Sequence, residues 1–229
     1  MRPRRAEVMG NIAYLFIVGA GFSHNAGLPL TSGFTEQLLA APPAGQSAPI
    51  VKFLRKFVAE TFDHSKTAAA KFWPELEDIF TCVDLSANTG HHLGKSYPPS
   101  DLRTVRRALI VRTIRMLRET YKKGNDRNDA KWKSLEQFLS MVKAEQCGFL
   151  SMNWDTVIEE GLSRTQKIIG FDYGCEAVAA DFKGSTIVPK SEPRKKMEVC
   201  VLKPHGSSNW LYCATERSRS GTHLTRLRG

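Results

Sequence analysis

The sequence predicts an α/β fold: a parallel sheet with helices on both faces and a helical insertion. Three short apolar stretches, over residues 13–18, 148–152 and 199–202, have the length and composition of buried strands. Stretches with helical spacing of apolar residues lie between the first two and directly after the second. Strands that alternate with helices form parallel sheets. We therefore expect a Rossmann-like arrangement.

Six helices are predicted from apolar spacing and helix-start signals. In the clearest, Ile50, Phe53, Leu54, Phe57, Val58 and Phe62 form one apolar face, with charged residues between them. Pro74 suits the first turn of the next helix. The predicted helices cover residues 34–39, 50–62, 74–83, 101–121, 132–142 and 156–162. Most of them belong to a helical insertion over about 42–145.

Composition favours a globular domain without metal or disulfides. Hydrophobic residues make up 41% of the 229 residues and charged residues 24%. No apolar stretch reaches the roughly 18 residues of a membrane span, and the run 12–18 leads into glycines rather than a signal-peptide cleavage site. The five cysteines are odd in number and form no C-x-x-C pair. We expect reduced thiols, no bound metal, no membrane association and a cytoplasmic location.

The net charge of +10 is concentrated in a few segments. Basic residues gather at both ends of the chain, at 190–196 and in the helix over 101–121. That helix carries six arginines spread around its circumference, which favours a solvated or salt-bridged surface over a phosphate-binding face. Nucleic-acid binding stays open as the alternative. Residues 214–229 offer few apolar side chains and are expected to form a basic, disordered tail.

Polar clusters follow all three predicted strands. They are the glycine loop at 19–27, Asn153-Trp154-Asp155, and His205-Gly206-Ser207. In a parallel sheet ligands bind outside the carboxyl ends of the strands, so the three clusters should converge. The glycine loop alone is not a dinucleotide fingerprint, because His24 stands where the third glycine belongs and no acidic residue follows about 20 residues later.

Taken together, GAGFSHNAGLP, SMNWD and KPHGSSNW resemble, in this order, the sirtuin-like family, named after the silent information regulator fold. The resemblance covers roughly residues 13–213, and we assign 11–213 to this domain. Deacylating members carry a different sequence where Leu30-Thr31-Ser32 stands, a glutamine at Met152, and a four-cysteine zinc module, whereas here only Cys213 follows the histidine motif. The chain looks closer to the bacterial antiviral branch, whose members hydrolyse NAD and often act with a sensor module.

The resemblance implies that NAD is bound as the substrate and that two residues are catalytic. Asn153 would orient a water and a ribose hydroxyl, and His205 would accept a proton, since an imidazole has an ordinary pKa of about 6.5. Each has a simpler reading, as a turn residue or a strand-end histidine, and Asp155 is equally well explained as a helix cap. The expected cofactor-binding residues are Gly19, Ala20, Gly21, Ser23, Gly27, Asp155 and Ser207.

Two other functions are compatible with these motifs. The same fold supports protein deacylation, and the chain could also be a weak nucleotide-binding or scaffold module.

A sirtuin-like sheet has about six strands in the order 3-2-1-4-5-6, and only the first three are recognisable here. We therefore expect a domain that lacks its C-terminal half-sheet and binds NAD poorly alone. It should associate through the free edge of the first strand, as a homo-oligomer or with a partner subunit.

Overall fold

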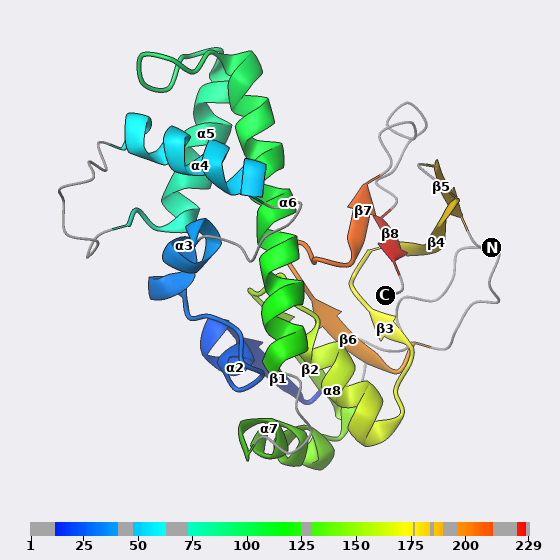
Figure 1. Cartoon of the computed structure of the whole chain (residues 1–229). Helices are drawn as coiled ribbons and strands as arrows, with labels where there is room; N and C mark the ends of the chain where they lie inside the picture. Colours follow the sequence, from blue (N-terminus) through cyan, green and yellow to red (C-terminus); the bar gives the residue numbers. More distant parts are fainter. Residues whose placement is uncertain are drawn as a thin grey trace. The chain divides into compact units, whose positions relative to one another are not determined.

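The computed structural model of the chain describes residues 12–40, 48–62, 73–124, 130–175, 177–183, 186–189, 197–212 and 224–227 (Figure 1). The chain divides into two compact units. The first comprises Met1–Gly27 and Asn125–Gly229, and the second comprises Leu28–Gly124. Among the described helices, none has the length and apolar character needed to cross a membrane.

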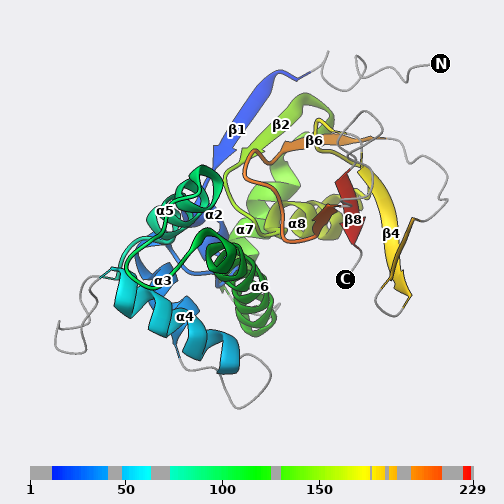
Figure 2. The same cartoon turned by 90° about the horizontal axis from the view of Figure 1, so that it is seen from above.

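The first unit contains a four-stranded sheet in which every pair of neighbours is parallel (Figure 2). Its strand order is β1 (Tyr14–Val18), β2 (Cys147–Ser151), β6 (Val199–Leu202) and β3 (Phe171–Asp172). The α/β fold class and all three predicted strands are therefore confirmed. Among the described residues the parallel sheet has four strands rather than a full set of six.

The helices of the first unit are the short α2 (Ala20–His24), α7 (Ala130–Met141) and α8 (Val157–Gln166). Phe16 of β1 stacks on Phe149 of β2 and meets Phe138 of α7 edge-on, which seats α7 against this side of the sheet. α8 packs closely on α7, because a Cβ at Gly161 would lie 2.2 Å from Leu139 Cδ1. The other side of β1 carries Leu15 and Ile17, which are 55% and 71% exposed.

A second sheet in the same unit has the order β5 (Thr186–Pro189), β4 (Ala177–Lys183), β8 (Leu224–Leu227) and β7 (Trp210–Tyr212). β8 runs parallel to β4 and antiparallel to β7. The expectation of a disordered tail over 214–229 is therefore wrong for Leu224–Leu227, while the rest of that range lies outside the described residues. The tail has too few apolar residues to predict a buried strand. β8 is nevertheless formed, because its backbone groups pair with those of β4 and β7, which are distant in the sequence.

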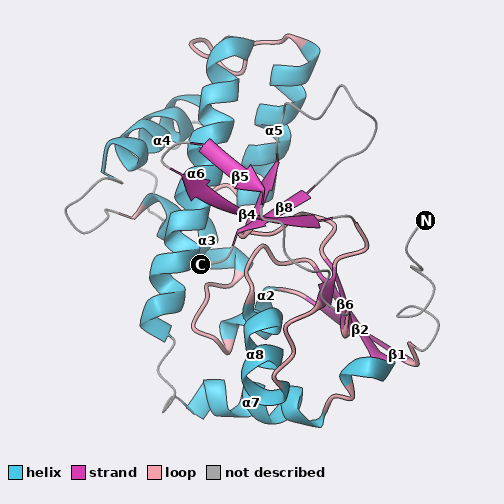
Figure 3. Ribbon diagram, turned by 90° about the vertical axis from the view of Figure 1, so that its right-hand side faces the viewer, coloured by secondary structure: helices cyan, strands magenta, loops and turns pink. Residues whose placement is uncertain are grey.

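The second unit is helical and contains α3 (Thr31–Leu39), α4 (Ala48–Thr61), α5 (Leu76–Thr89) and α6 (Pro99–Gly124) (Figure 3). Each of these helices was predicted, and each buries the apolar face that its spacing defines. The fully buried side chains at this core include Leu38, Leu39, Leu54, Phe57, Val58, Ile79, Val83, Leu102, Val105 and Leu109. The unit includes α3 and ends before α7, compared with the insertion of about 42–145 expected from the sequence.

The arginines of α6 do not form one binding face. Arg112 is 3% exposed, donates from Nε to the carbonyl of Leu38 at 3.0 Å, and lies 3.3 Å from Glu119 through Nη1. Arg106 forms an ion pair with Asp84 at 2.6 Å. Arg103, Arg107 and Arg118 are exposed. One arginine therefore ties α6 to the end of α3, which is a structural role.

We expect the substitution Arg112→Ala to lower the free energy of unfolding by about 2–4 kcal/mol, because it leaves the Leu38 carbonyl without its charged donor and opens a cavity. The matched substitution Arg103→Ala, at an exposed position of the same helix, should change it by less than about 0.5 kcal/mol. Urea unfolding followed by circular dichroism measures both. Equal effects of the two substitutions would contradict this role for Arg112.

Candidate functional site

The three polar clusters begin at one edge of the parallel sheet. Val18 is in register with Ser151, and Leu150 with Leu202, so β1, β2 and β6 end side by side. The residues after β2 then contact both neighbours. Asn153 bonds to the loop after β1, and the Trp154 carbonyl accepts a hydrogen bond from the Ser208 amide at 2.6 Å in the segment after β6. The expected convergence at the carboxyl ends of the strands therefore occurs.

Asn153 is held by both of its amide hydrogens. Nδ2 donates to the carbonyl of Gly19 at 2.8 Å and to Ser23 Oγ at 2.7 Å. The backbone amide of Asn153 also donates to Ser151 Oγ at 3.3 Å. An amide side chain has two N–H donors and one carbonyl acceptor. With both donors engaged, Oδ1 is the atom that Asn153 can offer to a water or a hydroxyl.

The glycine loop has exposed glycines and one buried polar residue, Ser23. Gly19 and Gly21 are exposed, and a Cβ built on either one would meet no atom within 4 Å apart from its own chain neighbours and helix backbone. Ala20 is half-buried and begins α2, and Gly27 ends this segment with a φ of 82°, which favours glycine. Ser23 was expected to bind the cofactor, but it is 2% exposed and its Oγ accepts the hydrogen bond from Asn153.

The segment after β6 turns sharply at the predicted histidine. The Gly206 amide donates to the carbonyl of Lys203 at 3.0 Å, and Gly206 has a φ of 87°. His205 is exposed, and within the described part of the chain its ring makes no hydrogen bond. Ser207 Oγ lies 3.4 Å from the carbonyl of Trp154, to which it donates. The ring position of His205 is therefore set by the backbone of this turn.

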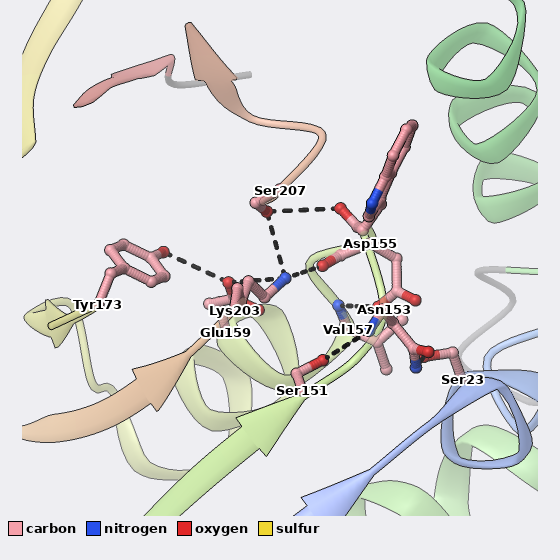
Figure 4. Close-up of polar contacts among 10 residues, drawn as sticks. Ser23, Ser151, Asn153, Asp155, Val157, Glu159, Tyr173, Lys203 and Ser207 are labelled. Atoms are coloured by element: carbon pink, nitrogen blue, oxygen red, sulfur yellow. Dashed lines mark hydrogen bonds and ion pairs between the residues drawn. The ribbon is translucent and has the colours of Figure 1, made fainter. Parts of the chain in front are cut away.

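Sequence reasoning missed a buried ion pair beneath the site. Lys203 Nζ lies 3.3 Å from Glu159 Oε1, and the two side chains are 1% and 4% exposed (Figure 4). Lys203 also donates to the Asp155 carbonyl and, at 3.2 Å, to Ser207 Oγ, while the Tyr173 hydroxyl donates to Glu159 at 3.3 Å. The available signal was a lysine directly after an apolar strand and a glutamate among the apolar residues of the α8 face.

Asp155 has a clear local role. Its Oδ1 accepts a hydrogen bond from the Val157 amide at 3.0 Å, at the first residue of α8. Such a bond satisfies one of the backbone donors that a helix leaves unpaired at its start. The carboxylate therefore fixes the exit of the loop that carries Asn153. The structure gives this side chain a capping contact on one oxygen.

The groups that this site offers for chemistry are the Asn153 amide, the His205 imidazole and the exposed backbone of the glycine loop. The described residues contain no group of three or more histidines, cysteines or acidic residues that could hold a metal ion. Burial raises the pKa of the Cys200 thiol in β6, so this cysteine is not a nucleophilic thiolate at neutral pH.

No protein-family model matches the sequence, and a search of curated proteins finds no match.

If Asp155 acts mainly as the cap of α8, the substitution Asp155→Ala should lower the free energy of unfolding by about 1 kcal/mol. Asp155→Asn retains a side-chain oxygen that accepts a hydrogen bond from the Val157 amide. Its free energy of unfolding should fall by at most about 0.3 kcal/mol. Thermal unfolding of both variants by calorimetry tests this. Identical losses in the two variants would show that the charge, and not the capping bond, is what matters.

Proposed function

We propose that this protein hydrolyses NAD at the bond between nicotinamide and ribose, as the resemblance to antiviral sirtuin-like proteins implies. The observation that carries the proposal is the bonding of Asn153 to the glycine loop at the carboxyl edge of three adjacent parallel strands. In open α/β sheets this edge is where nucleotides bind. The motifs that prompted the resemblance therefore lie at a position suited to one shared ligand.

The open glycines support a ligand that approaches the backbone. Neither Gly19 nor Gly21 has a positive φ, and neither is packed against another part of the chain. Gly19 is the N-cap of α2, where glycine is among the favoured residues. For Gly21, inside α2, folding alone gives no reason for glycine, which is destabilising in a helix relative to alanine. Close approach of a pyrophosphate or ribose is a physical reason that remains. The polar amides at the start of this segment are suitable donors to phosphate oxygens.

The proposed reaction consumes NAD and water and yields nicotinamide, ADP-ribose and a proton. The glycosidic bond breaks with its electron pair going to the nicotinamide nitrogen, and a water oxygen forms the new bond to the ribose carbon. Asn153 Oδ1 would accept a hydrogen bond from that water or from a ribose hydroxyl. His205 would take the proton that the water loses and release it to solvent. The exposure of His205 suits that exchange.

We expect Asn153→Ala and His205→Ala each to reduce nicotinamide release by about a hundredfold or more, because each removes a group that contacts the reacting atoms. Release from millimolar NAD by a high concentration of the chain is measured by liquid chromatography, with circular dichroism to verify folding. Release that is the same in the native chain and both variants would refute the proposal. Release of nicotinamide only with an acylated peptide would indicate deacylation instead.

The substitution Gly21→Ala separates binding from folding. A Cβ there meets open space and Gly21 lies within α2, so the variant should be as stable as the native chain or more stable by up to about 1 kcal/mol. If NAD approaches this backbone, its KM should rise about tenfold or more. Gly33→Ala in α3, also a helical glycine without a close neighbour, is the matched control and should leave KM unchanged. An unchanged KM in Gly21→Ala would argue against the glycine loop as the binding surface.

A further inference from the structure

We propose that Lys203 is a positioning residue that fixes the loop of Asn153 and the turn of His205 relative to each other. The proposal rests on the proposed function for its effect on turnover, but the positioning itself is testable without NAD. It starts from the two loops that bear the candidate catalytic groups. These loops follow different strands, and in the described part of the chain Asn153 and His205 form no hydrogen bond with each other.

The ammonium group of Lys203 reaches three separate elements. Its acceptors are the Asp155 carbonyl in the loop after β2, Ser207 Oγ in the segment after β6, and Glu159 Oε1 in α8. An ammonium group has three N–H donors, so each contact can use one of them. Figure 4 shows Lys203 between these three partners. One side chain thus joins both loops to the helix that follows the first of them.

The position of His205 needs such a support. The ring is exposed and makes no hydrogen bond within the described residues, so its place depends on the backbone from Lys203 to Ser208. That backbone is held against the Asn153 loop by the Ser208 amide and Ser207 Oγ, both bonded to the Trp154 carbonyl. Lys203 bonds to Ser207 and to Asp155, on either side of this junction.

Glu159 serves a different purpose from the other two acceptors. Its carboxylate balances the buried charge of Lys203, and the Tyr173 hydroxyl donates to the same oxygen. Removing Lys203 alone leaves Glu159 as an uncompensated buried charge, which would destabilise the fold. A single substitution therefore mixes folding with positioning. Removing both charges together separates them.

The test uses the double variant Lys203→Met with Glu159→Gln, beside Lys203→Met alone. We expect the double variant to fold, with exchange of the Ser208 amide hydrogen at least about tenfold faster than in the native chain. NAD turnover should fall by about tenfold or more in kcat, with KM changed by less than about twofold. Lys167→Met, at an exposed lysine of the same unit, is the control and should alter neither quantity.

The outcomes are distinguishable. If the double variant has the same exchange rate of the Ser208 amide hydrogen and the same kcat as the native chain, Lys203 only neutralises Glu159. That result would overturn the proposal. A double variant that does not fold would assign Lys203 to folding and would also overturn it. If the native chain releases no nicotinamide, the proposed function fails, and the exchange of the Ser208 amide still decides whether Lys203 positions the two loops.

Discussion

Lys203 and Glu159 carry opposite charges whose nearest atoms are 3.3 Å apart, in a region where almost no water reaches either side chain. Leaving either charge buried without the other would cost roughly 3–5 kcal/mol, so the pair constrains every element that supplies it. Glu159 lies on α8, the helix that follows the loop of Asn153, and Lys203 is the first residue after β6, two residues before His205. The carboxyl edge of the sheet is therefore built around one buried ion pair, which lies beneath the proposed binding surface.

Above this pair, the site is built mainly from backbone geometry. Parallel strands bring their carboxyl ends to one edge, and β1, β2 and β6 each deliver a loop there. The loops are then joined by hydrogen bonds, from Asn153 to Gly19 and from Ser208 to Trp154. The groups left for chemistry are Asn153 Oδ1, the exposed His205 ring and the open surface of two glycines. This combination suits a ligand that brings its own leaving group and needs orientation more than acid catalysis.

The fold class followed from local patterns in the sequence. Short apolar runs that end in glycine or polar residues predicted β1, β2 and β6, and apolar spacing together with helix-start signals predicted α3 to α8. These patterns are reliable because a buried face imposes its own period on the chain. The four strands of the second sheet were missed, as was β3 of the parallel sheet, because no apolar run that ends in glycine or a polar cluster marks them in the sequence. Their pairing depends on partners far away in the sequence, such as β4 for β8.

For the site, the sequence by itself determined which clusters follow which strands, and hence that Gly19, Asn153 and the His205 turn share one edge. It could not determine which atoms meet there. Ser23 is chemically suited to bind a phosphate, and only tertiary packing buried it against Asn153. Lys203 and Glu159 are 44 residues apart and ordinary on the surface of most proteins. Only the tertiary fold, which brings Glu159 of α8 to the residue that follows β6, removed both side chains from water and so made two common charged residues a buried support beneath the site.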